Sequence, residues 1–412
     1  MTEIAAKDTK DIKVVQIEMR EHRSLWGDAW RRLISSNTAR IGLVIISLFI
    51  LTTTLSHFFW DYNPKTDLDY SLKLKGPNLF PTEEVDSIHP FGTDKLGRDI
   101  FRRVVHGGWN SLRVGLVAVG ISLIVGGLLG LISGFYESIN LGSSERVVVL
   151  TIAGLLLGAL PAWIADQFII ALLLAILGGA AAWFEHFQAR KPLRFLLFAL
   201  LGGLCGALPA LWVSPSTALV TGILGLSIGL FVAIPVRGSI ISNVIMRIMD
   251  ITLAFPSYLL AIAIVAFLGP GLEKGMIAIG IVGIPQFARL VRSSVLSVSQ
   301  KEYILASQSV GEGHGRIIFR HIVPNILSPV IVQTTMGLAN AILSAAALGF
   351  LGLGAIPPEP EWGAMLGDSY RFLTSGAWWA VLFPGLAIML SVLGFNLLGD
   401  GLRDALDPKL RI

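Results

Sequence analysis

Long runs of apolar residues, separated by shorter polar stretches, divide this 412-residue chain. Each run has about 17 to 25 residues, which is enough for a helix to cross the hydrocarbon core of a bilayer. A membrane β-barrel would instead show alternating segments of roughly ten residues, and the sequence has no such pattern. Charged residues make up 15% and hydrophobic residues 53%, whereas soluble proteins are about 25% charged. The sequence therefore predicts an all-α fold, a polytopic bundle of transmembrane helices.

Basic residues at the ends of the runs predict how the chain crosses the membrane. Residues 1–40 are polar, with Arg32 and Arg40 close to the first run, and Arg403 follows the last run. Basic residues beside a span favour the cytoplasm, so we expect both termini inside. The first run starts too late for a secretory signal, and we expect a retained anchor. Ten crossings are predicted, at 41–60, 114–136, 147–163, 167–184, 195–213, 217–236, 251–268, 275–294, 326–351 and 377–399.

The middle of the chain, residues 137–237, contains a repeat. The sequence "GALPA" occurs at 158–162 and again at 206–210, an offset of 48, and Gly154 and Gly202 keep that offset. The motif ends the first run of each of two pairs, and the basic linker "EHFQARKPLR" separates the pairs. The pattern predicts two helical hairpins with both GALPA turns outside and the linker in the cytoplasm. The alternative is chance recurrence in a sequence rich in Leu, Ala and Gly.

A charged stretch over 297–325 interrupts the apolar pattern. Each charge near mid-bilayer costs about 2.5–3.5 kcal/mol, so we expect this stretch to lie in water. Its charged residues are Lys301, Glu302, Glu312, Arg316 and Arg320.

The same stretch has helical periodicity. Tyr303, Ile304, Ala306 and Val310 are expected to share one apolar face. Gly311 is predicted to end a short helix. After the turn, "RIIFRHIV" predicts a second short helix, with Pro324 at the entry to the next span. Small residues on another face of the first helix would let a partner's backbone approach closely. The alternative is an interfacial helix that lies on the lipid surface.

A cluster of possible metal ligands lies in the polar segment before the second run, and consists of His89, Asp94, Asp99 and His106. We expect instead a turn followed by an interfacial helix, and we predict no metal site. In that helix Ile100 and Val104 would face lipid while Arg103 faces water. The single cysteine, Cys205, excludes an intrachain disulfide.

Several enzyme motifs are missing from the sequence. It has no phosphate-binding loop of the form G-x-x-x-x-G-K-[ST] and no H-E-x-x-H. We therefore predict that the chain is not itself an enzyme, and we expect no cofactor and no binding to nucleic acid. Two other classes stay open at this point, an intramembrane hydrolase and a proton-coupled secondary transporter. The second should carry several buried ionisable residues, which the spans nearly lack.

Four stretches resemble the permease subunits of ABC importers. In the cytoplasmic coupling loop of that family, a small-residue triplet precedes a glycine, and a proline follows the glycine by thirteen residues. Here Leu305-Ala306-Ser307 precede Gly311, and Pro324 follows it by thirteen. The family glutamate is displaced to Glu302, and Gln308 stands where a basic residue is usual. Segments 89–116, 243–262 and 351–366 resemble the second, C-type permease of the dipeptide, oligopeptide and nickel branch, in the family's order.

This resemblance covers 1–136 and 238–412, and it implies a six-span core interrupted by four extra helices. The implied divisions are a cytoplasmic tail (1–40), two core spans with an outer polar segment (41–136), inserted hairpins (137–237) and the remaining core (238–412). The implied protein lies in the cytoplasmic membrane of bacterial type, where it forms a pathway with a second permease. An extracytoplasmic protein delivers di- or oligopeptides, with nickel as the alternative substrate.

The resemblance also implies two cytoplasmic ATPases that hydrolyse ATP and receive the coupling loop. The residues expected to contact them are Glu302, Tyr303, Ala306, Ser307, Gly311, Arg316 and Pro324.

Overall fold

The computed structural model describes residues 25–59, 62–64, 66–81, 87–138, 143–186, 191–232 and 238–406. Every regular element within these ranges is a helix, and strand-like pairing there is limited to two isolated β-bridges. The predicted all-α fold is therefore confirmed.

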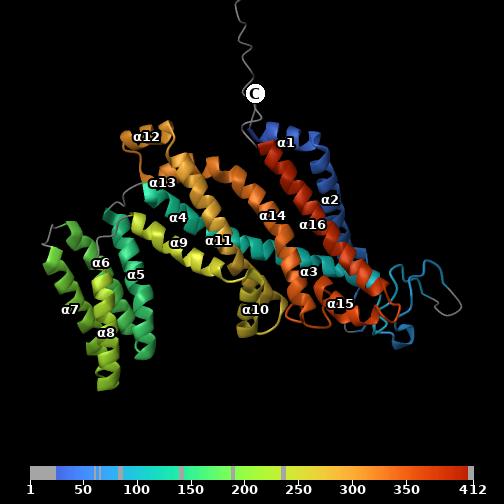
Figure 1. Ribbon diagram of the computed structural model, residues 1–412, viewed down its shortest axis with the longest axis horizontal. Coiled ribbons are helices and arrows are strands. Elements are labelled where there is room, and N and C mark those ends of the chain that lie inside the picture. Colours follow the sequence, from blue (N-terminus) through green and yellow to red (C-terminus); the bar gives the residue numbers. More distant parts are fainter. Residues whose placement is uncertain are drawn as a thin grey trace, which may run out of the picture.

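Six transmembrane elements form the core (Figure 1). In the described residues, five helical segments are long and apolar enough to cross a membrane, and one bent pair is a sixth if it counts as a single span. The predicted six-span core agrees with this count. The elements are α2 (Asn37–Phe59); α3 (Ile100–Ile121) with η2 (Ser122–Gly126) and α4 (Gly127–Ser138); α9 (Gly238–Ala254) with α10 (Ser257–Leu268); α11 (Leu272–Ser299); α13 (His314–Arg316) with η3 (Ile317–Ile322) and α14 (Val323–Phe350); and α16 (Trp379–Leu406).

The short helices outside the spans lie at the two ends of this core. At one end are α1 (Leu25–Ser35), α12 (Glu302–Ser309) and the last turns of α16 (Figure 1). At the opposite end lies α15 (Trp362–Ser369), which is followed by η4 (Tyr370–Phe372), and the outer segment also contains η1 (Tyr70–Leu72). The coupling loop and both ends of the described chain thus share one side, as the predicted topology requires. The assignment of that side to the cytoplasm stays a prediction.

The third core span differs from the single run predicted at 251–268. Two helices, α9 and α10, meet at an angle of 92°. The break falls at Phe255 and Pro256, where Pro256 has an extended backbone and precedes the first turn of α10. Proline has no N–H to donate and disfavours helical backbone in the residue before it. The break at Pro256 divides the element into two helices, and α9 begins 13 residues before the predicted start.

The second core span also starts earlier than the predicted 114–136. Helix α3 begins at Ile100, because the Asp99 carboxylate caps it by accepting the backbone N–H of Arg102 at 3.1 Å. Ile100 and Val104 are buried in the protein core. Arg103 is buried as well. The expectation of an interfacial helix with Ile100 and Val104 facing lipid and Arg103 facing water was therefore wrong.

The repeat region forms four helices beside the core (Figure 1). They are α5 (Ser143–Ile164), α6 (Phe168–His186), α7 (Lys191–Ala210) and α8 (Pro215–Val232). Within the described residues, their apolar stretches are shorter than those of the core spans, so their crossing of the membrane stays a prediction. Part of the basic linker, residues 187–190, lies outside the described residues.

Glycines at equivalent repeat positions allow the helices of each hairpin to approach closely. A Cβ atom added to Gly154 would collide with the carbonyl oxygen of Leu174, and one added to Gly202 would collide with that of Gly225. Two glycines that lie 48 residues apart thus make the same kind of close helix contact, which supports duplication of one hairpin. Both GALPA motifs lie in the last turns of their helices, and the tips that follow expose Trp163 and Trp212. Exposed tryptophans are typical of a membrane–water interface.

Gly202→Val is expected to destabilise the α7–α8 hairpin by about 1–3 kcal/mol, because the larger side chain overpacks the contact with Gly225. The matched control is Gly203→Val, since a Cβ at Gly203 has its nearest neighbour at 3.6 Å. Thermal unfolding of the two purified variants in mild detergent measures the difference. Equal midpoints for the two variants would contradict the close-packed hairpin.

Candidate coupling surface

Helix α12 forms the first part of the polar stretch between α11 and α14. Glu302 lies in its first turn, where a negative charge interacts favourably with the helix dipole. Ile304 is completely buried, in the same cluster as Phe135 and Val295 of the spans. One apolar side chain therefore attaches α12 to the core.

The other residues predicted for the apolar face are not buried. Tyr303 is 40% and Val310 is 88% exposed, and Ala306 is also exposed. The predicted apolar face is therefore divided: Ile304 packs against the core, and the other three residues are exposed. Exposed apolar side chains on a surface in water are typical of a docking site.

Gly311 ends α12, as predicted. Its backbone has φ of +82°, a conformation that side chains with a Cβ rarely adopt. The N–H of Gly311 donates to the carbonyl of Gln308 at 3.0 Å, and the N–H of Glu312 donates to that of Ser307 at 3.1 Å. These two bonds are the pattern of a Schellman cap. The glycine turn thus satisfies the last carbonyl groups of the helix and reverses the chain.

A shallow depression of about 800 Å³ lies where α12 faces the next helix. Its lining includes four of the predicted contact residues, which are Ala306, Ser307, Gly311 and Arg316. The other three predicted residues do not line the depression, although their side chains are exposed; they are Glu302, Tyr303 and Pro324. The structure therefore brings part of the predicted set together and places the rest on the surrounding surface.

The depression also contains charged residues that the prediction omitted. A carboxylate oxygen of Glu312 lies 3.0 Å from Nε2 of His321, within hydrogen-bonding distance. One Glu312 oxygen lies 3.7 Å from Nε of Arg316. Arg320 lines the same depression. The Glu312–Arg316 pair could have been predicted from the sequence, because the two residues stand at i and i+4. The contact between Glu312 and His321 could not, because it depends on how the chain turns between them.

The segment after the turn is continuous with the next span. Residues 314–350 form one helical segment of 37 residues, so the predicted separate second helix was wrong. A π-helical stretch, η3, precedes Pro324. Proline cannot donate to the carbonyl four residues earlier, and a π-turn in the chain before it is one way a helix accommodates such an interruption. Ile317 and Ile322 are completely buried, and this packing fixes the segment against the core.

At the opposite end, three of the four residues considered as metal ligands form polar pairs, and the ring of the fourth, His106, stacks on that of Tyr62. Nδ1 of His89 lies 2.8 Å from a carboxylate oxygen of Asp99. Asp94 accepts from Nε of Arg98 at 2.7 Å and also pairs with Arg103. In the described part of the chain, no group of three or more His, Cys, Asp or Glu side chains is arranged to hold a metal ion.

Glu361, beside α15, is a buried carboxyl group at this end. It accepts the backbone N–H groups of Gly363 and Ala364 at 2.8 and 2.9 Å. Burial raises the pKa of Glu361 to about 7, although these two donors act in the opposite direction. The buried carboxyl group of Glu361 thus caps α15.

Comparison with known proteins identifies the class of transport protein. Residues 225–412 match the family described as "Binding-protein-dependent transport system inner membrane component", and residues 24–77 match "N-terminal TM domain of oligopeptide transport permease C". A dipeptide transport system permease of Alkalihalophilus pseudofirmus is 39% identical over 388 residues, which are 94% of this chain and 91% of the relative. The chain belongs to this family, as a C-type permease subunit of the dipeptide and oligopeptide branch of ABC importers.

Two further relatives show the range of the similarity. A dipeptide transport system permease of Escherichia coli K12 is 55% identical over 168 residues, or 41% of this chain and 56% of the relative. A glutathione transport system permease of Pectobacterium atrosepticum is 32% identical over 94% of this chain and 93% of the relative. The protein is a multi-pass permease of the cytoplasmic membrane. Family membership overturns the hydrolase and proton-coupled transporter alternatives.

Proposed function

We propose that this permease imports di- or oligopeptides, together with a second permease, two cytoplasmic ATPases and an extracytoplasmic binding protein. ATP is hydrolysed on the ATPases, and α12 transmits their movement to the spans. The observation that carries this proposal is the attachment of α12 to the core through the buried Ile304. The 37-residue helical segment after the glycine turn continues directly into the membrane. Coupling requires such a physical connection between the two sites.

The exposed surface of α12 has the chemistry of a docking site. Val310 is an exposed apolar side chain, and Ala306 and Ser307 provide a surface with little side-chain bulk. Around them, Glu302, Tyr303 and Pro324 extend the contact area, with Arg316 beside the turn. A partner groove can therefore enclose α12 and contact its backbone closely.

Peptides are the proposed substrate class because the relatives aligned over most of the chain are dipeptide, di/tripeptide and glutathione permeases by name. No observation on this chain favours nickel, the alternative predicted from the sequence.

We also propose that 137–237 is an insertion into a core formed by 41–136 and 238–412, with both termini cytoplasmic. Supporting this, α5 starts next to α4 and runs toward the end of the molecule that contains α15 (Figure 1). The tips of the hairpins expose tryptophans. An even number of crossings leaves the orientation of the core unchanged. A reporter fused near Ala189 tests the topology, because an extracytoplasmic signal there would contradict it.

The pull-down of tagged Gly311→Glu from its native membrane tests the coupling site. Wild type is expected to retain an ATPase and a second permease, whereas the variant loses the ATPase, because a side chain at φ of +82° strains the cap and adds a charge.

Gly376→Glu is the matched control. Gly376 also has positive φ, +86°, and has open space around it, but it lies in the loop before α16 at the opposite end. This variant should keep both partners. Loss of the ATPase from both variants, or from neither, would contradict docking at α12.

A further inference from the structure

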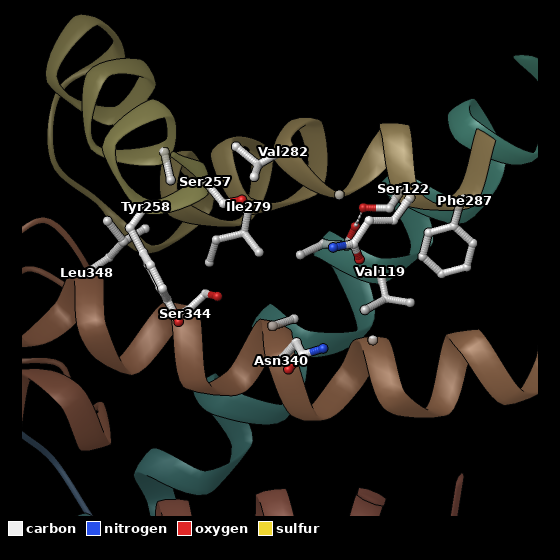
Figure 2. A pocket seen from close by; sticks show the side chains of 16 residues that line it. Val119, Ser122, Ser257, Tyr258, Ile279, Val282, Phe287, Asn340, Ser344 and Leu348 are labelled. Carbon is white, nitrogen blue, oxygen red and sulfur yellow. Dashed lines mark hydrogen bonds between the residues drawn. The ribbon is translucent and has the colours of Figure 1, made fainter. Parts of the chain in front are cut away.

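A cavity of about 290 Å³ lies within the transmembrane region, between α10, α11, α14 and the junction of α3 with η2. In Figure 2, Asn340 and Ser344 on α14 point toward the side chains of α10 and α11, and Tyr258 extends across the space between them. No lining residue carries a charge. The cavity is therefore polar but electrically neutral.

The polar lining does not suit contact with lipid. Asn340 and Gln286 are exposed, although they lie within the long apolar helices α14 and α11. Within the described part of the chain, neither side chain makes a hydrogen bond. A polar group without a partner is costly in hydrocarbon. This side of the chain must consequently face water, another polar ligand or a neighbouring protein.

The polar surface continues from the cavity along α11. Gln286, Arg289 and Ser293 are all exposed, and their spacing of three and four residues places them on one helix face. Arg289 pairs with Asp250 of α9 at 2.6 Å. In Figure 1, α11 runs from α10 toward the end at which α12 lies. The cavity thus opens onto a polar strip that leads toward the coupling surface.

We propose that the cavity and this strip are the chain's wall of the peptide path, and that Asn340 and Gln286 hydrogen-bond to the main-chain amides of an extended peptide. The inference rests on the proposed function, since a second permease must supply the opposite wall. A volume of about 290 Å³ is at the lower limit of ligand pockets, about 300 to 1,000 Å³, which agrees with a path completed by a partner.

Neutral amide and hydroxyl groups suit this task. They can pair with the amides shared by all peptides, without selecting the charge of the peptide side chains. A path must also bind weakly enough to release its cargo, and neutral hydrogen bonds contribute less than charged ones. The ligand class is therefore short peptides, recognised through their backbone.

The uptake arm of the test uses the complete complex in cells and radiolabelled dialanine as the probe. Asn340→Leu and Gln286→Leu are each expected to lower the uptake rate about fivefold through loss of one hydrogen bond, and Asn340→Gln should restore part of it. The matched control is Leu343→Ala, because Leu343 is exposed on the same helix but does not line the cavity. It should keep full uptake.

The second arm of the test measures whether a peptide protects a cysteine in the cavity from labelling. Ser344→Cys is used because it replaces a hydroxyl group by a thiol and changes the side chain little. In a Cys205→Ala background, which removes the single native cysteine, Ser344→Cys is treated with a small hydrophilic maleimide. Excess dialanine is expected to slow its labelling, while Leu343→Cys in the same complex shows no protection.

The two arms separate this inference from the proposed function. A complex that lacks the ATPase and the second permease in the pull-down refutes the proposed function. Two results would overturn the peptide path in a complete complex that takes up dialanine. One is that dialanine does not protect Ser344→Cys, and the other is that both leucine variants keep full uptake. Asn340 and Gln286 would then serve as polar contacts between the two permeases.

Discussion

Replacing Ile304 by alanine is expected to uncouple ATP hydrolysis from peptide uptake in the complete complex. Ile304 is the single buried residue of α12. Truncation of a buried isoleucine to alanine costs about 2–5 kcal/mol, and even the lower value shifts a local docking equilibrium by roughly 30-fold. The helix would then move independently of the spans. Uptake of dialanine should fall by more than about tenfold, while the ATPases continue to hydrolyse ATP.

The conservative variant Ile304→Val is the control for this prediction. It removes one methyl group, at a cost of about 0.5–1.5 kcal/mol, and should keep most of the coupling. Uptake and hydrolysis are measured together in proteoliposomes that contain the whole complex. A ratio of uptake to hydrolysis unchanged in Ile304→Ala would show that the buried anchor does not transmit the movement.

The sequence predicted α12 well because its signals are local. Charges such as Lys301 and Glu312 are too costly for mid-bilayer, so the stretch had to be in water. Gly311 marked the helix end, since a helix of L-residues commonly stops at a residue with positive φ. The orientation of the helix was not predictable in the same way. Tyr303 and Val310 have the periodicity of a buried face, but burial depends on which surface the core offers.

The shapes of the spans were less accessible to sequence reasoning. A proline such as Pro256 disfavours a continuous helix, but the 92° angle between α9 and α10 depends on packing against neighbouring helices. The early start of α3 followed from the cap at Asp99, within a stretch whose charges indicated a water-exposed segment. A cap can begin a transmembrane helix in a polar stretch when later contacts bury that stretch.

Tertiary packing explains the remaining failures. Arg103 was assigned to water, as is usual for an arginine, yet it is buried beside Asp94. Lys95 pairs with Asp368, a residue far along the chain, at 2.7 Å. Contacts of this kind, and the cavity lined by Asn340 and Gln286, arise only once distant helices are assembled. Apolar runs predict that helices exist, but not which of their faces are covered.

The buried ion cluster leads to the second large prediction, that Asp94→Ala destabilises the outer end of the protein by about 3–5 kcal/mol. Asp94 is 3% exposed and pairs with both Arg98 and Arg103, which are equally buried. Its carboxylate also accepts the backbone N–H groups of Leu96 and Arg98. Its removal would leave two buried cations without their shared counter-ion, together with unpaired N–H groups.

Lys95→Ala is the matched control, because the adjacent Lys95–Asp368 pair is about one-third exposed on both sides and such pairs contribute at most about 1 kcal/mol. Thermal unfolding in mild detergent should show a much larger loss for Asp94→Ala than for Lys95→Ala. The double variant Asp94→Leu/Arg103→Met should recover part of the loss, since apolar residues can replace a buried ion pair at little cost. Because Arg98 stays buried and its remaining pair in the described residues, with Asp368, is long at 3.9 Å, recovery should be incomplete. Equal losses for Asp94→Ala and Lys95→Ala would mean that water or main-chain groups already compensate the two arginines.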